Sequence, residues 1–194
     1  MAPLVLDFTN PLIAGGLPPD FPDVFRARIG VNVEDFNGFP QARLEVLGLL
    51  DVVPNSVVIS GDIHATYVVD HTNGVYEFTP PSISSTTFGQ FFQRGVEELL
   101  GPGDLAEQLA AALDPLLQLS SLDDERVSPS DIVYSNQWVH GFMVMEATPE
   151  ALHATIYQIP YTEIGTSYYD DPGTLEGLFE TLEFTVMDGM LVQE

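Results

Sequence analysis

Apolar and polar positions along the chain predict helices and strands that follow one another without a strict rhythm. Helical spacing or composition marks three segments, at residues 40–50, 88–100 and 105–119. Short β-rich runs predict strands at residues 57–59, 67–69, 75–78, 138–145 and 152–159, and a last hairpin within 182–192. Because strands and helices mix in this order, we expect an α/β fold of the mixed α+β kind, with mixed β-sheets flanked by helices.

Turn-forming residues divide the predicted strands into hairpins. Asn73-Gly74 separates the first pair and favours the positive φ angles of a type I′ turn. Thr148-Pro149-Glu150 and Asp188-Gly189 mark two further hairpins in the same way. Residues 57–59 are wholly apolar, which predicts a buried strand.

The sequence also predicts which side chains pack. Leu44, Leu47 and Leu50 repeat at near-helical spacing and predict the packed face of helix 40–50, with Arg43 elsewhere around the helix. Asp104 is expected to cap the helix that follows it.

Several histidines and aromatic residues are expected to be structural. His71 lies at a hairpin tip and is expected to be exposed, and His153 lies within a predicted strand as a packed or surface residue. Trp138 and the segment Tyr161–Tyr169 are expected to supply core or interface aromatics.

Three segments differ in composition. Residues 1–33 are rich in Pro and Gly and predict an extended lead-in, whereas residues 34–160 carry most of the regular elements. Residues 161–194 form an aromatic, acidic extension. We see no internal repeat and no linker between these segments.

The charge balance excludes several kinds of partner. The chain of 194 residues has 29 acidic residues, five arginines and no lysine, with a net charge of −24. Binding to nucleic acid depends on Lys and Arg that neutralise phosphates, so a nucleic-acid partner is excluded. Carboxylates in such number favour divalent cations such as Ca²⁺, and a saline, calcium-rich exterior. A generic acidic surface explains the composition equally well.

Residue usage limits the compartment and the chemistry. Cysteine is absent, which excludes disulfides, thiolate zinc sites and a cysteine nucleophile. No run of 18 apolar residues is present, so we expect no membrane span. The N-terminus, Met1 to Asp7, lacks the features of a signal peptide, so export would require a signal on a longer precursor or on a partner.

The strongest local chemical signal follows the strand at 57–59. A glycine, Gly61, turns the backbone there, and Asp62 and His64 come next. Active groups concentrate at the carboxyl ends of strands, where a carboxylate and an imidazole can bind metal or act as acid and base. On these residues alone, we favour the simpler interpretation in which Asp62 caps a turn and His64 faces solvent.

The neighbouring segments change that interpretation. Four segments occur in a fixed order, at residues 35–43, 60–64, 77–85 and 141–150. In order and spacing they resemble the C-terminal half of the PhoD-like alkaline phosphatases, in the calcineurin-like metallophosphoesterase superfamily. The likeness covers about residues 30 to 158 and includes the Gly-Asp-x-His and Thr-Pro-Glu elements of that family.

This resemblance implies a fold, an activity and a set of site residues. The fold would be the C-terminal half of a sandwich of two sheets between helices, and the activity would be hydrolysis of phosphate monoesters or diesters with calcium and iron. Asp62 corresponds to a metal ligand, Asn37 stands where the family has a ligand aspartate, and Asp35 could substitute for it. His64 corresponds to the family's histidine two residues further on, a catalytic residue that either contacts phosphate or orients a group that binds the metal. The implied substrate-facing residues are Ser84, Ser85, Asn136 and His140.

The resemblance is incomplete, which leaves alternatives open. The metal-binding motifs of the family's N-terminal half have no counterpart, and Asp123-Asp124-Glu125-Arg126 lacks the histidine of one of them and predicts solvated surface. A second chain or a precursor segment would have to supply them, in a secreted or periplasmic enzyme, and the chain alone is expected to be inactive. The alternatives are a non-catalytic acidic extracellular module and a small calcium-binding domain of other ancestry.

Overall fold

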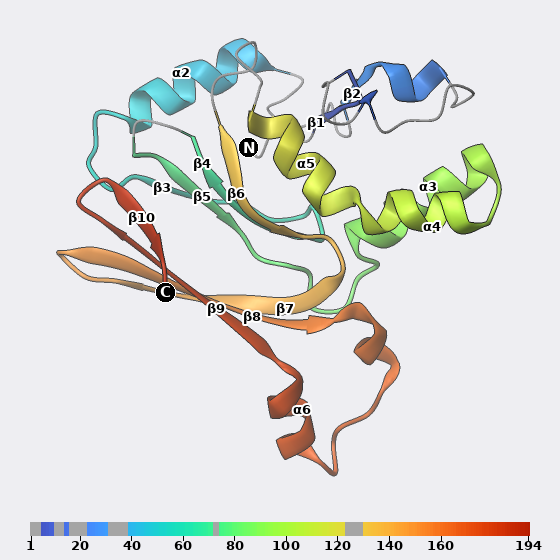
Figure 1. Cartoon of the computed structure of the whole chain (residues 1–194). Coiled ribbons are helices and arrows are strands. Elements are labelled where there is room, and N and C mark those ends of the chain that lie inside the picture. Colours follow the sequence, from blue (N-terminus) through green and yellow to red (C-terminus); the bar gives the residue numbers. More distant parts are fainter. Residues whose placement is uncertain (1–4, 10–13, 16–22, 31–38, 72–73, 123–129) are drawn as a thin grey trace.

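Two β-sheets lie face to face in the computed structural model, and helices cover the outer side of one of them (Figure 1). The structure describes residues 5–9, 14–15, 23–30, 39–71, 74–122 and 130–194. This arrangement confirms the expected mixed α/β class.

The first sheet has four strands in the order β3-β5-β4-β6. These strands are β3 (Val57–Ile59), β4 (Thr66–Asp70), β5 (Tyr76–Thr79) and β6 (Asp131–Asn136). β3 is parallel to β5, and the other pairs are antiparallel. As a result, the ends of β3, β5 and β6 and the start of β4 meet at one end of the sheet.

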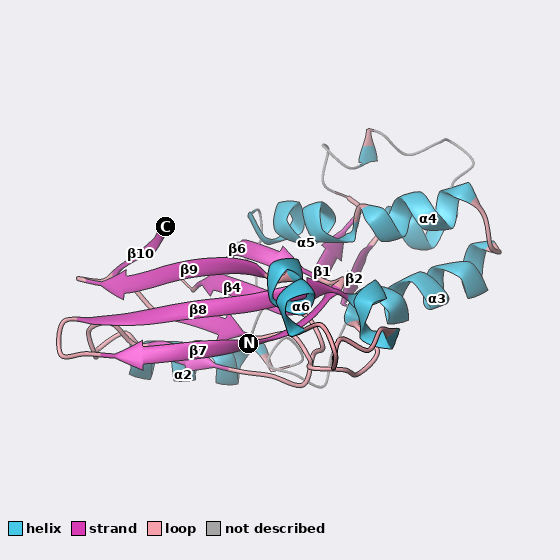
Figure 2. Ribbon diagram, turned by 90° about the horizontal axis from the view of Figure 1, so that it is seen from below, coloured by secondary structure: helices cyan, strands magenta, loops and turns pink. Residues whose placement is uncertain are grey.

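The second sheet is antiparallel, in the order β10-β9-β8-β7. It consists of β7 (Val139–Ala147), β8 (Ala151–Pro160), β9 (Glu180–Met187) and β10 (Met190–Gln193). Figure 2 shows β7, β8 and β9 side by side. The strand pairs of all three predicted hairpins are confirmed, and Asn73 of the first turn lies outside the described residues. At the last of them, Asp188 (φ 52°) and Gly189 (φ 71°) both have the positive φ of a type I′ turn.

Apolar side chains fill the space between the two sheets. Phe78 of the first sheet meets Phe184 of the second edge to face, with ring centroids 6.0 Å apart. The other buried members of this cluster are Val68, Tyr76, Ala154, Ile156 and Val186. Since these residues alternate along their strands, each sheet presents one face to this core.

A second core lies between the first sheet and the helices α3 (Phe88–Leu100), α4 (Asp104–Ala111) and α5 (Leu113–Leu122). A small sheet of β1 (Val5–Asp7) and β2 (Arg28–Gly30) and the short η1 (Asp23–Arg26) also belong to this layer. The buried members include Leu6, Phe8, Phe25, Tyr67, Val69, Leu109, Leu113, Leu117 and Ile132.

The helix predicted over residues 105–119 is wrong in one respect, because the segment forms two helices. Pro115 has no backbone N–H, so it cannot continue the hydrogen bonding of α4 and is accommodated in the first turn of α5. The residue that caps α4 is Gly103, not Asp104, which lies within the first turn. Asp104 still favours this helix end, where the partial charge is positive.

The bounds of α2 (Pro40–Leu50) are confirmed, but its predicted packed face is wrong at Leu44 and omits Arg43. Arg43 is fully buried together with Leu47, whereas Leu44 is 46% exposed. The side chains that Arg43 meets are polar, and a guanidinium can bind them whereas a leucine cannot. The prediction that β3 is buried is also wrong, because β3 is an edge strand and Ile59 is 63% exposed.

The connection between β8 and β9 is long and projects from one end of the sandwich (Figure 1). It contains η2 (Tyr161–Gly165) and α6 (Pro172–Leu178). In the described part of the chain, no helix is long and apolar enough to cross a membrane, in agreement with the sequence-based expectation.

Candidate functional site

The loop after β3 holds two residues in an unusual backbone conformation. Asp62 has φ 70° and His64 has φ 59°. The left-handed region costs a non-glycine residue roughly 1–2 kcal/mol, so surrounding contacts must hold this loop in place. Strained residues of this kind cluster at binding and catalytic sites. Asp62 is exposed, and His64 is half-buried beside the ring of Phe91.

Two histidines bind the same loop, residues 80–87, from different elements. Nδ1 of His64 lies 2.8 Å from the carbonyl oxygen of Thr86, and Nδ1 of His140 lies 3.2 Å from that of Ser82. A carbonyl oxygen only accepts, so Nδ1 carries the proton in each ring, and Nε2 keeps its lone pair when the ring is neutral. A histidine that binds metal is commonly oriented by this same contact.

Backbone hydrogen bonds reinforce both contacts. The amide of Phe88 donates to the carbonyl of His64 at 3.0 Å, and the amide of Gly141 donates to the carbonyl of Ser82 at 3.0 Å. Glycine is required at this position for the pairing of β7 with β8, since a Cβ on Gly141 would lie 1.9 Å from the carbonyl oxygen of Tyr157. Loop 80–87 is therefore fixed at both ends beside a histidine.

The remaining predicted site residues are distributed as follows. Ser84 and Ser85 are exposed on loop 80–87. Asn136 is paired with Thr66 at the same end of the sheet, and its Oδ1 accepts from the amide of Trp138 at 3.0 Å. Asp35 and Asn37 lie outside the described residues. Among the residues that are described, no group of three His, Asp or Glu side chains is placed to hold a metal ion.

A buried polar relay lies beside this site, and sequence reasoning missed it. Arg43 Nη2 donates to Ser130 Oγ at 2.7 Å, and Ser130 lies 2.9 Å from Nδ1 of His71. Nε2 of His71 lies 2.8 Å from Oε2 of Glu77. Ser60 then donates to Oε1 of Glu77 at 2.5 Å. The prediction that His71 is exposed is wrong, because its side chain closes this relay.

Burial and hydrogen bonding set the charges in the relay. Burial lowers the pKa of His71, and this effect outweighs the opposing effect of Glu77. Burial alone would raise the pKa of Glu77, but hydrogen bonds from His71 and Ser60 help to bring it well below its ordinary value. The relay therefore contains the Arg43 cation, a neutral His71 with its proton on Nε2, and the Glu77 carboxylate.

Ser130, His71 and Glu77 have the order of a serine-hydrolase triad, but their environment argues against that role. None of the three is more than 2% exposed, and Arg43 donates to the hydroxyl oxygen that would have to attack. A nucleophilic serine must reach its substrate. We therefore interpret the relay as structural.

The relay is connected to the candidate site through Ser60. Oγ of Ser60 contacts Glu77 and also Oγ1 of Thr79 at 2.6 Å, and its amide donates to the carbonyl of Phe78 at 3.1 Å. Ser60 directly precedes Gly61 and Asp62. The relay thus fixes the base of the loop that carries Asp62 and His64.

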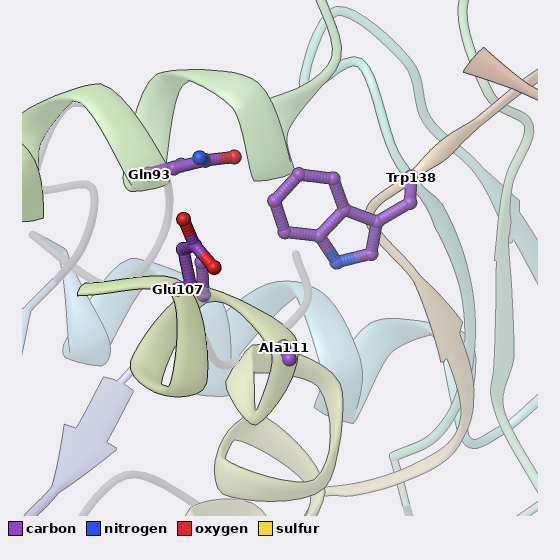
Figure 3. A pocket seen from close by; sticks show the side chains of 5 residues that line it. Gln93, Glu107, Ala111 and Trp138 are labelled. Carbon is purple, nitrogen blue, oxygen red and sulfur yellow. The ribbon is translucent and has the colours of Figure 1, made fainter. Parts of the chain in front are cut away.

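A cavity of about 360 Å³ opens beside Trp138 between α3 and α4 (Figure 3). Glu107 of α4 points toward Gln93 of α3, and the indole of Trp138 lies beside both. Trp138 packs over Gly89, where a Cβ would lie 2.6 Å from the indole ring. Trp138, expected from the sequence in a core or an interface, is half-buried and lines this cavity.

A larger cavity of about 610 Å³ lies between the second sheet and residues 161–179. His140 and Ile83 line it, so it adjoins loop 80–87.

Comparison of the chain with protein-family models, with curated proteins and with solved structures found no match in any of the three.

Proposed function

We propose that this chain forms part of a metal-dependent hydrolase of phosphate monoesters or diesters. The observation that carries the proposal is the pair His64 and His140, whose Nδ1 atoms bind backbone carbonyls of one loop at the end of the first sheet. Such pairing is how proteins commonly orient metal-binding histidines. The nearby left-handed conformation of Asp62 and His64 supports the same interpretation.

In this proposal the described residues supply part of a metal site. Asp62 contributes a carboxylate, and His64 contacts the phosphoryl group or a metal through Nε2. Ser84, Ser85, Asn136 and His140 face the substrate. Asp35, Asn37 and polypeptide outside these 194 residues, from a precursor or a second chain, supply the remaining ligands. Bound calcium and iron would generate the hydroxide nucleophile and polarise the phosphoryl group.

The charge of the chain supports a site that contains cations. A net charge of −24 repels a phosphate ester, and no lysine is available to offset it. Metal ions would supply the missing positive charge at the point where the substrate binds. The same composition suits a secreted or periplasmic setting that is saline.

A non-catalytic acidic module of the same fold is the second candidate. It is favoured by one observation, that no three metal-binding side chains converge within the described residues. The two candidates differ in whether Asp62 binds a metal in the assembled protein.

The test is the metal content and phosphatase rate of the complex recovered through an affinity tag on this chain from the cells that produce it. We expect Asp62→Asn to lower both by orders of magnitude, since it removes a charged ligand and keeps the shape. The matched control is Asp170→Asn, which removes the same charge from an exposed loop and is expected to change neither.

The isolated chain gives a second check. We expect it to hydrolyse a chromogenic phosphomonoester negligibly, because part of the metal site is absent. Metal-dependent turnover by the chain alone, or unchanged metal content in Asp62→Asn, would contradict the proposal. The second result would favour the non-catalytic module.

A further inference from the structure

The connection from β8 to β9 is much longer than the two strands require. Gln158 pairs directly with Glu180, so a tight turn of a few residues could join them. Residues 161–179 intervene instead and include η2 and α6. Long connections within a compact fold are commonly kept for binding or catalysis.

This connection forms one wall of the cavity of about 610 Å³, and β7 and β8 form the other. The volume is in the range of sites for small organic molecules. Four aromatic side chains line it: Phe142, Tyr168, Tyr169 and Phe179. Phe142 is held in place, since it stacks on Tyr157 at 4.9 Å between ring centroids and meets Phe179 edge to face at 6.1 Å.

The described lining holds one carboxylate, Glu163, and one imidazole, His140, whose Nδ1 is hydrogen-bonded to the carbonyl oxygen of Ser82. Glu163 is the acidic side chain in the described lining, which contains no arginine. The hydroxyl of Tyr168 donates to Oε2 of Glu163, which fixes the carboxylate at the wall. A carboxylate can accept about four hydrogen bonds, so Glu163 keeps capacity for a ligand.

We propose that this cavity binds a small organic cation with an apolar body, such as a quaternary amine or a protonated tertiary amine that carries an aromatic or alkyl group. Aromatic faces attract cations through their quadrupole, and the Glu163 carboxylate adds a full opposite charge. The net charge of −24 raises the local concentration of cations and disfavours anions. The cavity shares His140 with the phosphohydrolase proposal, but the inference does not rest on that proposal.

Two other classes of ligand fit less well. A neutral apolar molecule would remove water from Glu163 without replacing its hydrogen bonds, which costs free energy. A bare metal ion needs several oxygen or nitrogen donors, whereas the described lining is mostly apolar. The described residues also contain no group of three side chains placed to hold a metal ion.

A pair of matched probes tests the proposal on the 194-residue chain. The cation is (4-hydroxybenzyl)trimethylammonium, and its neutral counterpart of the same shape is 4-neopentylphenol. We expect the cation to bind about ten-fold more tightly at low salt, with the preference reduced at high salt. Titrations followed by NMR would measure both affinities and locate the binding residues.

Variants separate charge from shape. Glu163→Gln removes the carboxylate charge, so we expect about a ten-fold loss of cation affinity. Because the amide keeps the shape and an acceptor for Tyr168, affinity for the neutral probe should change little. Glu150→Gln is the matched control, because it removes one exposed charge from the turn at the opposite end of β7 and β8. Tyr169→Ser should also weaken cation binding severalfold without loss of folding, since Tyr169 is 92% exposed.

The proposal is overturned by equal affinity for the two probes, by absence of cation binding at millimolar concentration, or by an equal loss in Glu163→Gln and Glu150→Gln. Because no hydrolysis is measured, these outcomes do not depend on the phosphatase proposal. The wild-type comparison of the probes also stands if a variant fails to fold.

Discussion

Nε2 of His71 lies 2.8 Å from Oε2 of Glu77, and neither side chain is more than 2% exposed. The pair brings together the end of β4 and the middle of β5, and Arg43 approaches from α2 through Ser130. An ionised carboxylate is tolerated in the interior only when hydrogen bonds and a counter-charge surround it. The relay satisfies that condition and makes folding dependent on pH.

We expect stability to fall in two stages as the solution is acidified. His71 has a folded-state pKa below its ordinary 6.5, so the unfolded chain takes up a proton first and stability decreases below about pH 6.5. Glu77 has a folded-state pKa below its ordinary 4.5, so a further decrease begins below about pH 4.5. Urea unfolding measured between pH 8 and pH 3 would show both stages.

Substitution of His71 isolates the first stage. His71→Gln should lower stability at neutral pH, by about 1–3 kcal/mol, and flatten the pH dependence above about pH 5. His153→Gln is the control for the loss of a histidine, because His153 is an exposed residue of β8. An unchanged profile in His71→Gln would show that other groups cause the first stage.

Arg43 should be among the most sensitive positions of the chain. Arg43→Met removes a buried cation and its hydrogen bond to Ser130, which we expect to cost about 3–5 kcal/mol. The double variant with Glu77→Gln should recover part of that loss. Arg94→Met, at an exposed position on α3, should change stability by less than about 0.5 kcal/mol. Similar losses of stability in Arg43→Met and Arg94→Met would contradict a structural role for the relay.

Two glycines should respond to alanine in opposite directions. At Gly141, a Cβ would lie 1.9 Å from the carbonyl oxygen of Tyr157, so Gly141→Ala must displace the β7–β8 pairing and should cost more than about 3 kcal/mol. At Gly48, within α2, a Cβ meets nothing within 4 Å. Gly48→Ala should therefore stabilise the chain by about 0.5–1 kcal/mol, through helix propensity. Thermal unfolding of the pair tests both signs.

Asp62 should show a conflict between stability and function. Its φ of 70° suits glycine, and its side chain is exposed, so Asp62→Gly should be neutral or stabilise by up to about 1 kcal/mol. In the proposed enzyme the same change removes a metal ligand. Ser85→Gly, at a loop position without positive φ, should instead be slightly destabilising. A loss of stability in Asp62→Gly would remove the argument from backbone strain.

The elements that the sequence predicted correctly are those specified by local signals. Asn-Gly and Asp-Gly turns fix hairpins within a few residues, and Pro40 marks the start of α2. β6 was not predicted because its buried and exposed positions do not alternate, so its sequence lacks the alternating pattern of a strand. Its pairing with β4 shifts register between Val68 and Val69, which breaks the period of two that reveals a strand.

Long-range contacts could not be read from the sequence. The partners of Arg43 are 28 and 87 residues away in the chain, so its burial depends on topology and not on the helix pattern. The edge position of β3 likewise follows from the strand order. Asp62, His64 and His140 were selected through the order of sequence segments, but the contacts of both histidines with loop 80–87 required the structure. The aromatic cavity gave no recognisable sequence signal.

The bond between Arg43 and Ser130 has a consequence for the order of folding events. Its two residues are 87 positions apart, so closing that loop precedes any gain from the contact. We expect the relay to form after the folding transition state, once β4, β5 and β6 have paired. Substitutions in the relay should then accelerate unfolding while refolding rates remain nearly constant. A relay that forms late would slow unfolding, so it would determine how long the native state persists more than how quickly that state is reached.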